Sequence, residues 1–521
     1  MVERADLIIT NAEIHTLTET DETHEAVAIR DGEIVRVGVG YEVEFLEGIE
    51  TTVIDLAGGV LLPGFIDAHT HMEMVGRSLV YADLSQATSI DEALSLLRDA
   101  ARDDREWILG YGYDESAWDE QRYLTRDDLD RVSEEQPVAA FREDMHTGGL
   151  NSVALDRHAS EMPTSDVRHS DGEPTGVVVE DALDPIHRET APDYEATREL
   201  VTAARDRAHA LGVTGVHDMV RNSRAPRVYR DLDSDGDLDL RVRINYWSDH
   251  LDALCELGAA TNHGSEFVQV GGVKSYSDGS FGGRTAKLTE PYEGEYKEDE
   301  GEGTKTGQWV VGEELNGIVR QADDADLQCT VHAIGDAAIT AVLDAYDTTD
   351  DPDVARHRIE HAELLTDDLI QRFADSGVVA SVQPNFLKWA REDGLYEERL
   401  GRERTRQTNR YRSLLDAGVP LAFGSDCMPL DPLFGIQQTV TAPTAEQRLT
   451  VTEALRAYTS GAAYAGFDEN RLGTIEVGKQ ADLVALDSSP WEVNQERIAD
   501  IDVISTIVDG QVVYDDGSIN R

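Results

Sequence analysis

The sequence predicts an α/β protein whose centre is a (β/α)8 TIM barrel, and three observations support this. Eight short apolar runs recur between residues 60 and 427 and alternate with amphipathic stretches. Strands that alternate with helices indicate parallel βα units, and eight such units close a barrel. Both ends of the chain carry short alternating runs instead, and residues 74–204 separate the first apolar run from the second.

The two ends of the chain predict one discontinuous β-sandwich, formed by residues 1–58 and 470–521. "ADLIITNAEIHTL" and "EAVAIRDGEIVRVG" near the start resemble "ADLVALD" and "ISTIVDGQVVYDDG" near the end, with Asp31-Gly32 and Asp509-Gly510 as turn signals. Two unrelated small sheets are the alternative. Each of them would be too small to be stable alone, which favours the shared sandwich.

The predicted barrel comprises residues 59–73 and 205–469. Its eight strands are assigned to "VLLPGFIDAH", "VTGVHDM", "LRVRINYW", "QVGGVKSY", "CTVHAIG", "HRIEHAEL", "VVASVQPN" and "PLAFGSDC". Residues 74–204 are predicted to be an insertion after the first strand that covers the active site. Long loops on the catalytic face of such barrels often have this role.

The charge balance predicts a protein adapted to concentrated salt. The chain has 103 acidic and 46 basic residues, a formal net charge of -57, and only six lysines, which include Lys274. In about 1 M salt the Debye length is only about 3 Å, so the self-repulsion of such a surface is screened. The same surface excludes nucleic acid and anionic membranes as partners. A small-molecule substrate is expected, and a homodimer is compatible with the sequence.

The three cysteines and the start of the chain predict a cytoplasmic location. Cys255, Cys329 and Cys427 have no CxxC spacing and are odd in number, which argues against a disulfide framework. The first residues lack the unbroken apolar run of a signal peptide, and no apolar stretch is long enough to span a membrane.

Metal-compatible side chains fall at the carboxyl ends of the predicted barrel strands, where barrel enzymes place their chemistry. His69 and His71 are two residues apart, so both leave the same face of strand one. The remaining candidates are Lys274 on strand four, His332 on five, His361 on six and Asp426 on eight. Four imidazoles and a carboxylate suit a divalent cation, with zinc favoured.

This arrangement resembles the amidohydrolase superfamily of metal-dependent hydrolases over nearly the whole chain. The matching motifs are "PGFIDAHTH", the strand-four lysine, the histidines on strands five and six, and "GSD" on strand eight. "VKSYSDGSFGGRTAKL", "VHAIGDAAI" and "RHRIEHAELL" are similar to the branch that contains N-substituted formamide deformylase. The resemblance implies hydrolysis of a C–N bond in an amide, an N-substituted formamide or a cyclic amide. A deaminase of the same fold, or a catalytically silent barrel that serves binding or regulation, are the alternatives.

The resemblance also implies roles for the candidate ligands. In binuclear members the strand-four lysine reacts with CO2, and the carbamate bridges two metal ions, which arginine could not do. One zinc would be held by His69, His71, Lys274 and Asp426, and the second by Lys274, His332 and His361. A metal-activated hydroxide would attack, with Asp426 as general base and then general acid. A mononuclear site, with Lys274 simply paired with an acid such as Asp278, is the alternative.

Further candidates concern the substrate. His146, in "DMHTGGLN", matches a family segment near the pocket and is predicted to contact the substrate carbonyl or the developing oxyanion. Asp278 and Arg284 follow strand four, and Asn385 follows strand seven, so all three are expected to contact substrate. His217, on strand two, is expected to support the site from behind the ligands.

Overall fold

The computed structural model describes residues 4–143, 147–294 and 305–519 of the 521-residue chain. The chain divides into two compact units, one of residues 1–71 and 206–521 and the other of residues 72–205. The bounds of the second unit are close to the 74–204 predicted for the insertion.

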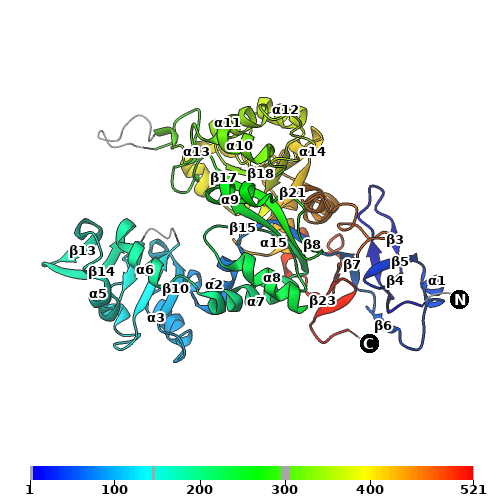
Figure 1. Cartoon of the computed structure of the whole chain (residues 1–521), viewed down its shortest axis with the longest axis horizontal. Coiled ribbons are helices and arrows are strands. Elements are labelled where there is room, and N and C mark those ends of the chain that lie inside the picture. The colour runs from blue at the N-terminus through cyan, green and yellow to red at the C-terminus, as the bar shows by residue number, and fades with distance from the viewer. Residues whose placement is uncertain (1–3, 144–146, 295–304, 520–521) are drawn as a thin grey trace. The chain divides into compact units, whose positions relative to one another are not determined.

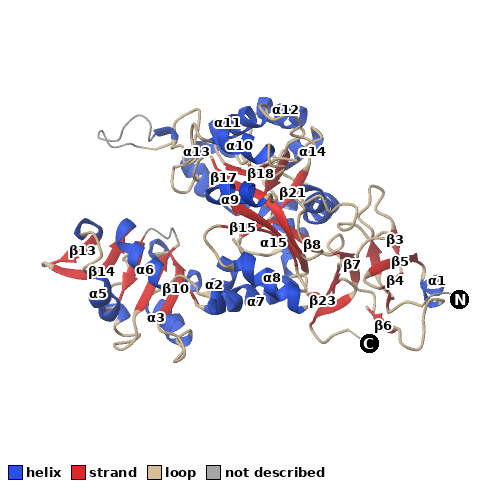
Figure 2. Cartoon of the chain, viewed as in Figure 1, coloured by secondary structure: helices blue, strands red, loops and turns tan. Residues whose placement is uncertain are grey.

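The first unit contains the predicted barrel (Figures 1 and 2). Eight parallel strands form one sheet in the order β21-β20-β19-β18-β17-β16-β15-β8. The strands are β8 (Phe65–Thr70), β15 (Val213–Val220), β16 (Arg241–Trp247), β17 (Val268–Tyr276), β18 (Gln328–Ala333), β19 (Arg358–His361), β20 (Val379–Val382) and β21 (Leu421–Phe423). Each predicted apolar run contributes one of them, so the (β/α)8 prediction is confirmed.

Backbone hydrogen bonds join the two edge strands of this sheet. The N–H groups of Ser425 and Asp426, just after β21, donate to the carbonyl of His69 on β8 at 3.1 and 2.7 Å. The side chain of Asp67 adds a second link, because its Oδ1 accepts from the N–H groups of His69 and Ser425 at 3.0 Å each. The barrel is thereby closed at the end where the candidate ligands lie.

Helices follow the barrel strands along the chain. They include α8 (Ala225–Asp235), α9 (Leu251–Leu257), α10 (Leu315–Asp323), α11 (Asp336–Tyr346), α12 (Asp367–Ser376) and α14 (Tyr411–Asp416). Local sequence sets their ends. In α12 the Thr366 side chain accepts from the N–H of Leu369, and Gly377 ends the helix at φ +67°.

The two ends of the chain form two sheets around one core. A four-stranded sheet has the order β5-β4-β1-β6, and a six-stranded sheet has the order β24-β23-β22-β7-β2-β3. Their strands are β1 (Leu7–Thr10), β2 (Glu13–His15), β3 (Thr23–His24), β4 (Ala26–Arg30), β5 (Glu33–Gly38), β6 (Thr52–Asp55), β7 (Val60–Pro63), β22 (Leu483–Leu486), β23 (Val503–Val508) and β24 (Gln511–Asp515). Ile9 and Val27 of the first sheet share a buried cluster with Leu61 and Leu483 of the second, so the predicted discontinuous sandwich is confirmed.

One boundary differs from the prediction. The run "VLLPGFIDAH" contains two strands, because β7 pairs with β22 and β2 in the terminal sheet while β8 pairs with β15 in the barrel. Gly64 separates them. A Cβ at this position would lie 2.3 Å from the side chain of Thr214, so any larger residue here would force Thr214 or the backbone to shift.

Residues 72–205 form a six-stranded sheet with the order β13-β14-β12-β11-β10-β9. The strands are β9 (Ala82–Asp83), β10 (Ile108–Tyr113), β11 (Val138–Arg142), β12 (Thr147–Leu150), β13 (Val167–Ser170) and β14 (Glu173–Val179). The helices α3 (Ile90–Asp99), α5 (Ser152–His158) and α6 (Asp184–Glu189) pack with it. Tyr113 and Trp118 are buried in its core. Coverage of the active site by this unit stays a prediction.

Within the described residues, no helix combines the length and apolar character that a membrane crossing requires.

Candidate metal centre

The two histidines of the strand-one motif are held by hydrogen bonds from their Nδ1 atoms. His69 contacts Glu360, whose Oε2 lies 2.5 Å from Nδ1 of the ring. Nδ1 of His71 lies 2.9 Å from the carbonyl oxygen of Met219 on β15. A carbonyl can only accept, so Nδ1 of His71 carries a proton, and in the neutral ring Nε2 has the free lone pair. The same tautomer fits His69 beside the carboxylate of Glu360.

Asp426 lies against the Nε2 atoms of both histidines. Its Oδ1 is 3.6 Å from Nε2 of His69 and 3.3 Å from Nε2 of His71. Asp426 and the following Cys427 have φ values of +52° and +56°, a region that residues other than glycine rarely adopt. Such backbone costs about 1–3 kcal/mol per residue and clusters at functional sites, where the surrounding structure enforces it.

His361 completes a three-residue group with His69 and Asp426. One ligand atom from each lies within 4.8 Å of the others. Arg358 and Glu360 share one face of β19, so regular alternation would turn His361 away from them. Its φ of +73° breaks the alternation, and its ring centre lies 5.0 Å from that of His69.

His332 lies next to His361, and the centres of their rings are 4.5 Å apart. Its Nε2 is 2.9 Å from the carbonyl oxygen of Gly279, to which it can only donate, so Nδ1 has the free lone pair. The structure therefore brings all four predicted histidines and Asp426 to one end of the barrel.

The side chain of Lys274 lies in the same region. Its side chain is 0% exposed, and among the described residues its Nζ has no hydrogen-bond partner. Nζ lies 5.0 Å from the centre of the Tyr276 ring. Burial lowers the pKa of Lys274 to about 8, although Glu360 and Asp426 favour its charged form. A buried ammonium without a hydrogen bond is costly, so burial makes the neutral amine far more accessible near neutral pH than it is for an exposed lysine.

The electrostatics favour the metal-binding forms of His69, His332, His361 and Asp426, whereas His71 is shifted toward its protonated form, which must lose a proton before it can bind a cation. Burial lowers the pKa values of His69, His332 and His361 well below the usual range, and neighbouring cations or imidazoles act in the same direction. For His71, burial also lowers the pKa, but the carboxylate of Asp426 more than offsets this and the net shift is upward. For Asp426, burial raises the pKa, but the two histidines and Lys274 more than offset this and the net shift is downward. Neutral imidazoles beside an ionised carboxylate are what a divalent cation requires.

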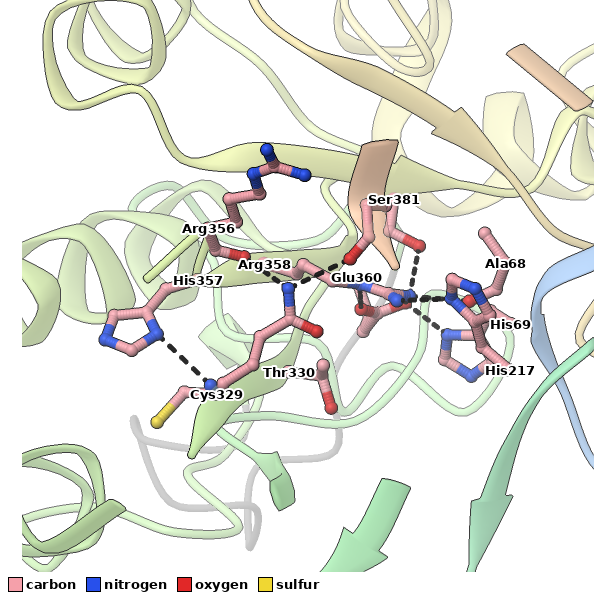
Figure 3. Close-up of polar contacts among 12 residues, drawn as sticks. Ala68, His69, His217, Cys329, Thr330, Arg356, His357, Arg358, Glu360 and Ser381 are labelled. Atoms are coloured by element: carbon pink, nitrogen blue, oxygen red, sulfur yellow. Dashed lines mark hydrogen bonds and ion pairs between the residues drawn. The ribbon is translucent and has the colours of Figure 1, made fainter. Parts of the chain in front are cut away.

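On the Nδ1 side of His69, Arg358 and Glu360 form a buried charge pair. Figure 3 shows Ala68, His69, His217 and Ser381 gathered around Arg358 and Glu360. Arg358 donates to both oxygens of Glu360, Nε to Oε1 at 2.8 Å and Nη2 to Oε2 at 3.1 Å. His217, expected to support the site from behind, accepts from Nη1 of Arg358 at 2.8 Å.

Asp278 does not pair with Lys274, the alternative that the sequence leaves open. Its carboxylate accepts from the backbone N–H groups of Lys287, Ile334 and Gly335 at 2.7, 3.0 and 2.9 Å. It therefore anchors the loop after β17 to the loop after β18. A contact between Asp278 and substrate stays a prediction.

The other predicted substrate contacts have different surroundings. Asn385 donates through Nδ2 to the carbonyls of Ser425 and Met428 at 2.7 and 2.9 Å, and its buried Oδ1 has no hydrogen-bond partner in the described part of the chain. Arg284 is half-buried, and its guanidinium donates to the carbonyl of Glu293. His146, predicted to act in catalysis and substrate binding, lies outside the described residues.

The residues at the site fit a metal ion. Imidazole nitrogens and a carboxylate oxygen converge there from separate strands, and the unpartnered, buried Nζ of Lys274 lies in the same region. The donor set is one that zinc and related cations accept.

A sequence model of the amidohydrolase family matches residues 52–514. The chain belongs to the amidohydrolase family. It is 30% identical to YtcJ of Bacillus subtilis (strain 168), which is named as an amidohydrolase, over 96% of this chain and 98% of the relative. It is 27% identical to the N-substituted formamide deformylase of Arthrobacter pascens over 99% of both chains.

A solved structure supports the same family relationship. An uncharacterised metal-dependent hydrolase from Pyrococcus furiosus superposes with a TM-score of 0.79 at 29% identity, covering 93% of this chain and 100% of that one. Because the family match covers most of the chain and the site has a metal-compatible donor set, the protein is an amidohydrolase-family, metal-dependent hydrolase.

Sequence reasoning missed the pair behind His69. Arg358 and Glu360 both lie in the run "RHRIEHAEL", beside the predicted ligand His361. The available signal was the placement of two opposite charges at alternate positions of an otherwise buried strand. Such residues are almost never buried unless they are paired.

Proposed function

We propose that the protein hydrolyses a C–N bond in a small amide, an N-substituted formamide or a cyclic amide. The observation that carries this proposal is the convergence of His69, His361 and Asp426 on one point at the carboxyl end of the barrel. The similarity to a relative named N-substituted formamide deformylase supports the C–N bond as the target. The substrate reaches the end of the barrel where such enzymes bind their ligands.

Zinc is the expected metal, with one or two ions per chain. His69, His71 and Asp426 would hold one ion and His332 and His361 the other, with Lys274 between them. When bound, such ions lower the pKa of water, so that hydroxide is available near neutral pH, and they polarise a scissile carbonyl.

Asp426 is the proposed general base and acid. Its pKa is lowered by His71, His69 and Lys274 in spite of burial, so its carboxylate is ionised at neutral pH and can accept a proton. It would take the proton of the attacking water and then deliver it to the leaving nitrogen. The backbone hydrogen bond from its own N–H to the carbonyl of His69 fixes its position relative to β8.

Lys274 is proposed to carry a carbamate derived from CO2. Only a neutral amine attacks CO2, and burial lowers the pKa of Lys274 to about 8. The absence of a hydrogen-bond partner for Nζ among the described residues also supports the proposal, because a carbamate would supply oxygens that the metal ions can bind.

The unit of residues 72–205 is proposed to restrict access to the site and to select substrates. Its support is the connectivity of the chain, because the segment begins directly after His71, at the carboxyl end of β8. Exchange of 72–205 for the equivalent segment of a relative should change KM and substrate preference but leave metal content unchanged. An unchanged preference across a substrate panel would contradict this role.

A hydrolase screen tests the proposed function. The purified chain is incubated with N-formyl and N-acyl amines, cyclic amides and amino-substituted heterocycles in multimolar KCl with added zinc or manganese. Release of carboxylate or formate together with amine supports the proposal, with Asp426→Asn as the inactive control. Release of ammonia alone from a heterocycle would indicate a deaminase. Metal binding without turnover of any substrate would favour a binding or regulatory protein.

A further inference from the structure

Arg358 connects four strands inside the barrel. Its side chain is 0% exposed, and from β19 it contacts three other strands. Nη2 donates to the carbonyl of Ala68 on β8 at 2.6 Å and to the Ser381 hydroxyl on β20 at 2.8 Å, and Nη1 donates to His217 on β15. A guanidinium has five N–H donors in a fixed planar geometry, so these contacts define its orientation.

Glu360 transmits that orientation to His69. Both of its oxygens accept from Arg358, and Oε2 also lies 2.5 Å from Nδ1 of His69. Because both oxygens of Glu360 already accept from Arg358, Oε2 meets Nδ1 of His69 as an acceptor. The proton of His69 is therefore on Nδ1, and the lone pair is on Nε2, the atom that faces Asp426. The other tautomer would place two acceptors against each other in a buried site.

We propose that Arg358 and Glu360 are positioning residues that fix the ring orientation and tautomer of His69 for metal binding. This inference depends on the proposed function, because it gives the pair a role only if His69 is a metal ligand. Carboxylates behind a ligand histidine orient its ring and raise its basicity, and their loss typically lowers metal affinity about 10–100-fold.

A second buried pair in the same unit serves as a matched control. Arg241 on β16 donates from Nε to Oδ2 of Asp482 at 2.6 Å and from Nη2 to Oδ1 at 2.9 Å. Both residues are buried, and Asp482 accepts from the backbone N–H of Asp509 rather than contacting a histidine. Asp482→Asn therefore removes the same kind of interaction as Glu360→Gln without touching a candidate ligand.

The test measures zinc affinity by chelator competition on the full-length, metal-stripped chain, together with thermal unfolding. Glu360→Gln is expected to bind zinc about 10–100-fold more weakly than the wild type. Asp482→Asn is expected to be destabilised but to keep its zinc affinity within about twofold, because distant sites are close to additive. If Glu360→Gln does not fold, the double variant Arg358→Gln with Glu360→Gln replaces it, since it leaves no unpaired buried charge.

The outcomes are distinguishable. Weakened zinc binding in the Glu360 variant but not in Asp482→Asn supports the positioning role. Equal zinc affinity in the wild type and a folded Glu360 variant overturns it, as does equal weakening in both single variants, which would reflect destabilisation alone. A wild type that binds no divalent cation overturns the proposed function itself and this inference with it.

Discussion

The two halves of the candidate metal centre differ in the hydrogen bonds that the protein provides to their candidate ligands. In the half formed by His69, His71 and Asp426, both Nδ1 atoms have acceptors, and both Nε2 atoms face Asp426. In the half formed by Lys274, His332 and His361, Nζ of Lys274 is buried and has no hydrogen-bond partner among the described residues. His332 resembles the first half in one respect, because its hydrogen bond to the carbonyl of Gly279 fixes its tautomer.

This difference indicates two kinds of metal binding. The first half is preorganised, because hydrogen bonds fix the tautomers before a cation arrives. We propose that the second half depends on a change at Lys274, since an amine on its own offers one lone pair and cannot bridge two ions. We therefore expect the first half to retain a cation when the second is disrupted, whereas disruption of the first should affect both.

The largest expected effect is on turnover in Asp426→Asn. The amide keeps the size of the side chain but cannot take a proton from water, so kcat should fall by about 10²–10⁴. Steady-state kinetics with any substrate found in the screen provide the measurement, and Asp482→Asn is the matched control. Turnover close to that of the wild type would mean that another group moves the proton.

Removal of metal should produce the next largest effect. At free metal about 1,000 times Kd, binding to the folded state alone adds about 4 kcal/mol to the free energy of unfolding. A chelator should therefore lower the midpoint of thermal unfolding. The double variant His69→Ala with His71→Ala should show no such shift, and a shift as large as that of the wild type would contradict the assignment of these ligands.

Lys274 variants should affect the second half alone. Lys274→Arg should lose the second ion but keep the first, because a guanidinium cannot form the carbamate. Lys274→Ala should regain metal content when a short carboxylic acid such as acetate is added, since the acid can occupy the vacated space. Metal analysis of the purified variants gives the result. Full metal content in Lys274→Arg would exclude a lysine bridge.

Ionic strength should not distinguish the two halves, because it acts mainly on the surface of a chain with a net charge of -57. We expect the chain to lose structure when KCl falls from about 3 M to about 0.1 M, as the screening of the acidic residues weakens. Circular dichroism follows the transition. An unchanged spectrum across this range would contradict the prediction of salt adaptation.

The sequence was informative where a signal repeats along the chain. The eight apolar runs predicted the barrel because both faces of its strands are buried, and the paired ends predicted the sandwich. Position at a strand end predicted His69, His332, His361 and Asp426 as ligands, and the structure places all four at one end of the barrel. These predictions needed only the direction of each strand.

What the sequence could not predict depends on contacts between distant strands. Glu360 reaches His69 across the barrel, and the neighbouring His361 reaches the same ring only because its φ is +73°. In a regular strand, Glu360 and His361 would point to opposite faces, so strand periodicity could not reveal that both approach His69. The division of "VLLPGFIDAH" between two sheets likewise depends on the close approach of Thr214 to Gly64, from a distant part of the chain.

The central claim is that Lys274 bridges a binuclear centre. A crystal structure of the chain grown with saturating zinc and bicarbonate, combined with metal analysis of the same preparation, tests it most directly. We expect two zinc ions per chain and extra density continuous with Nζ of Lys274, in the shape of a carbamate between them. A bare ammonium with one ion or none bound by the four histidines would contradict the claim and leave at most a mononuclear hydrolase.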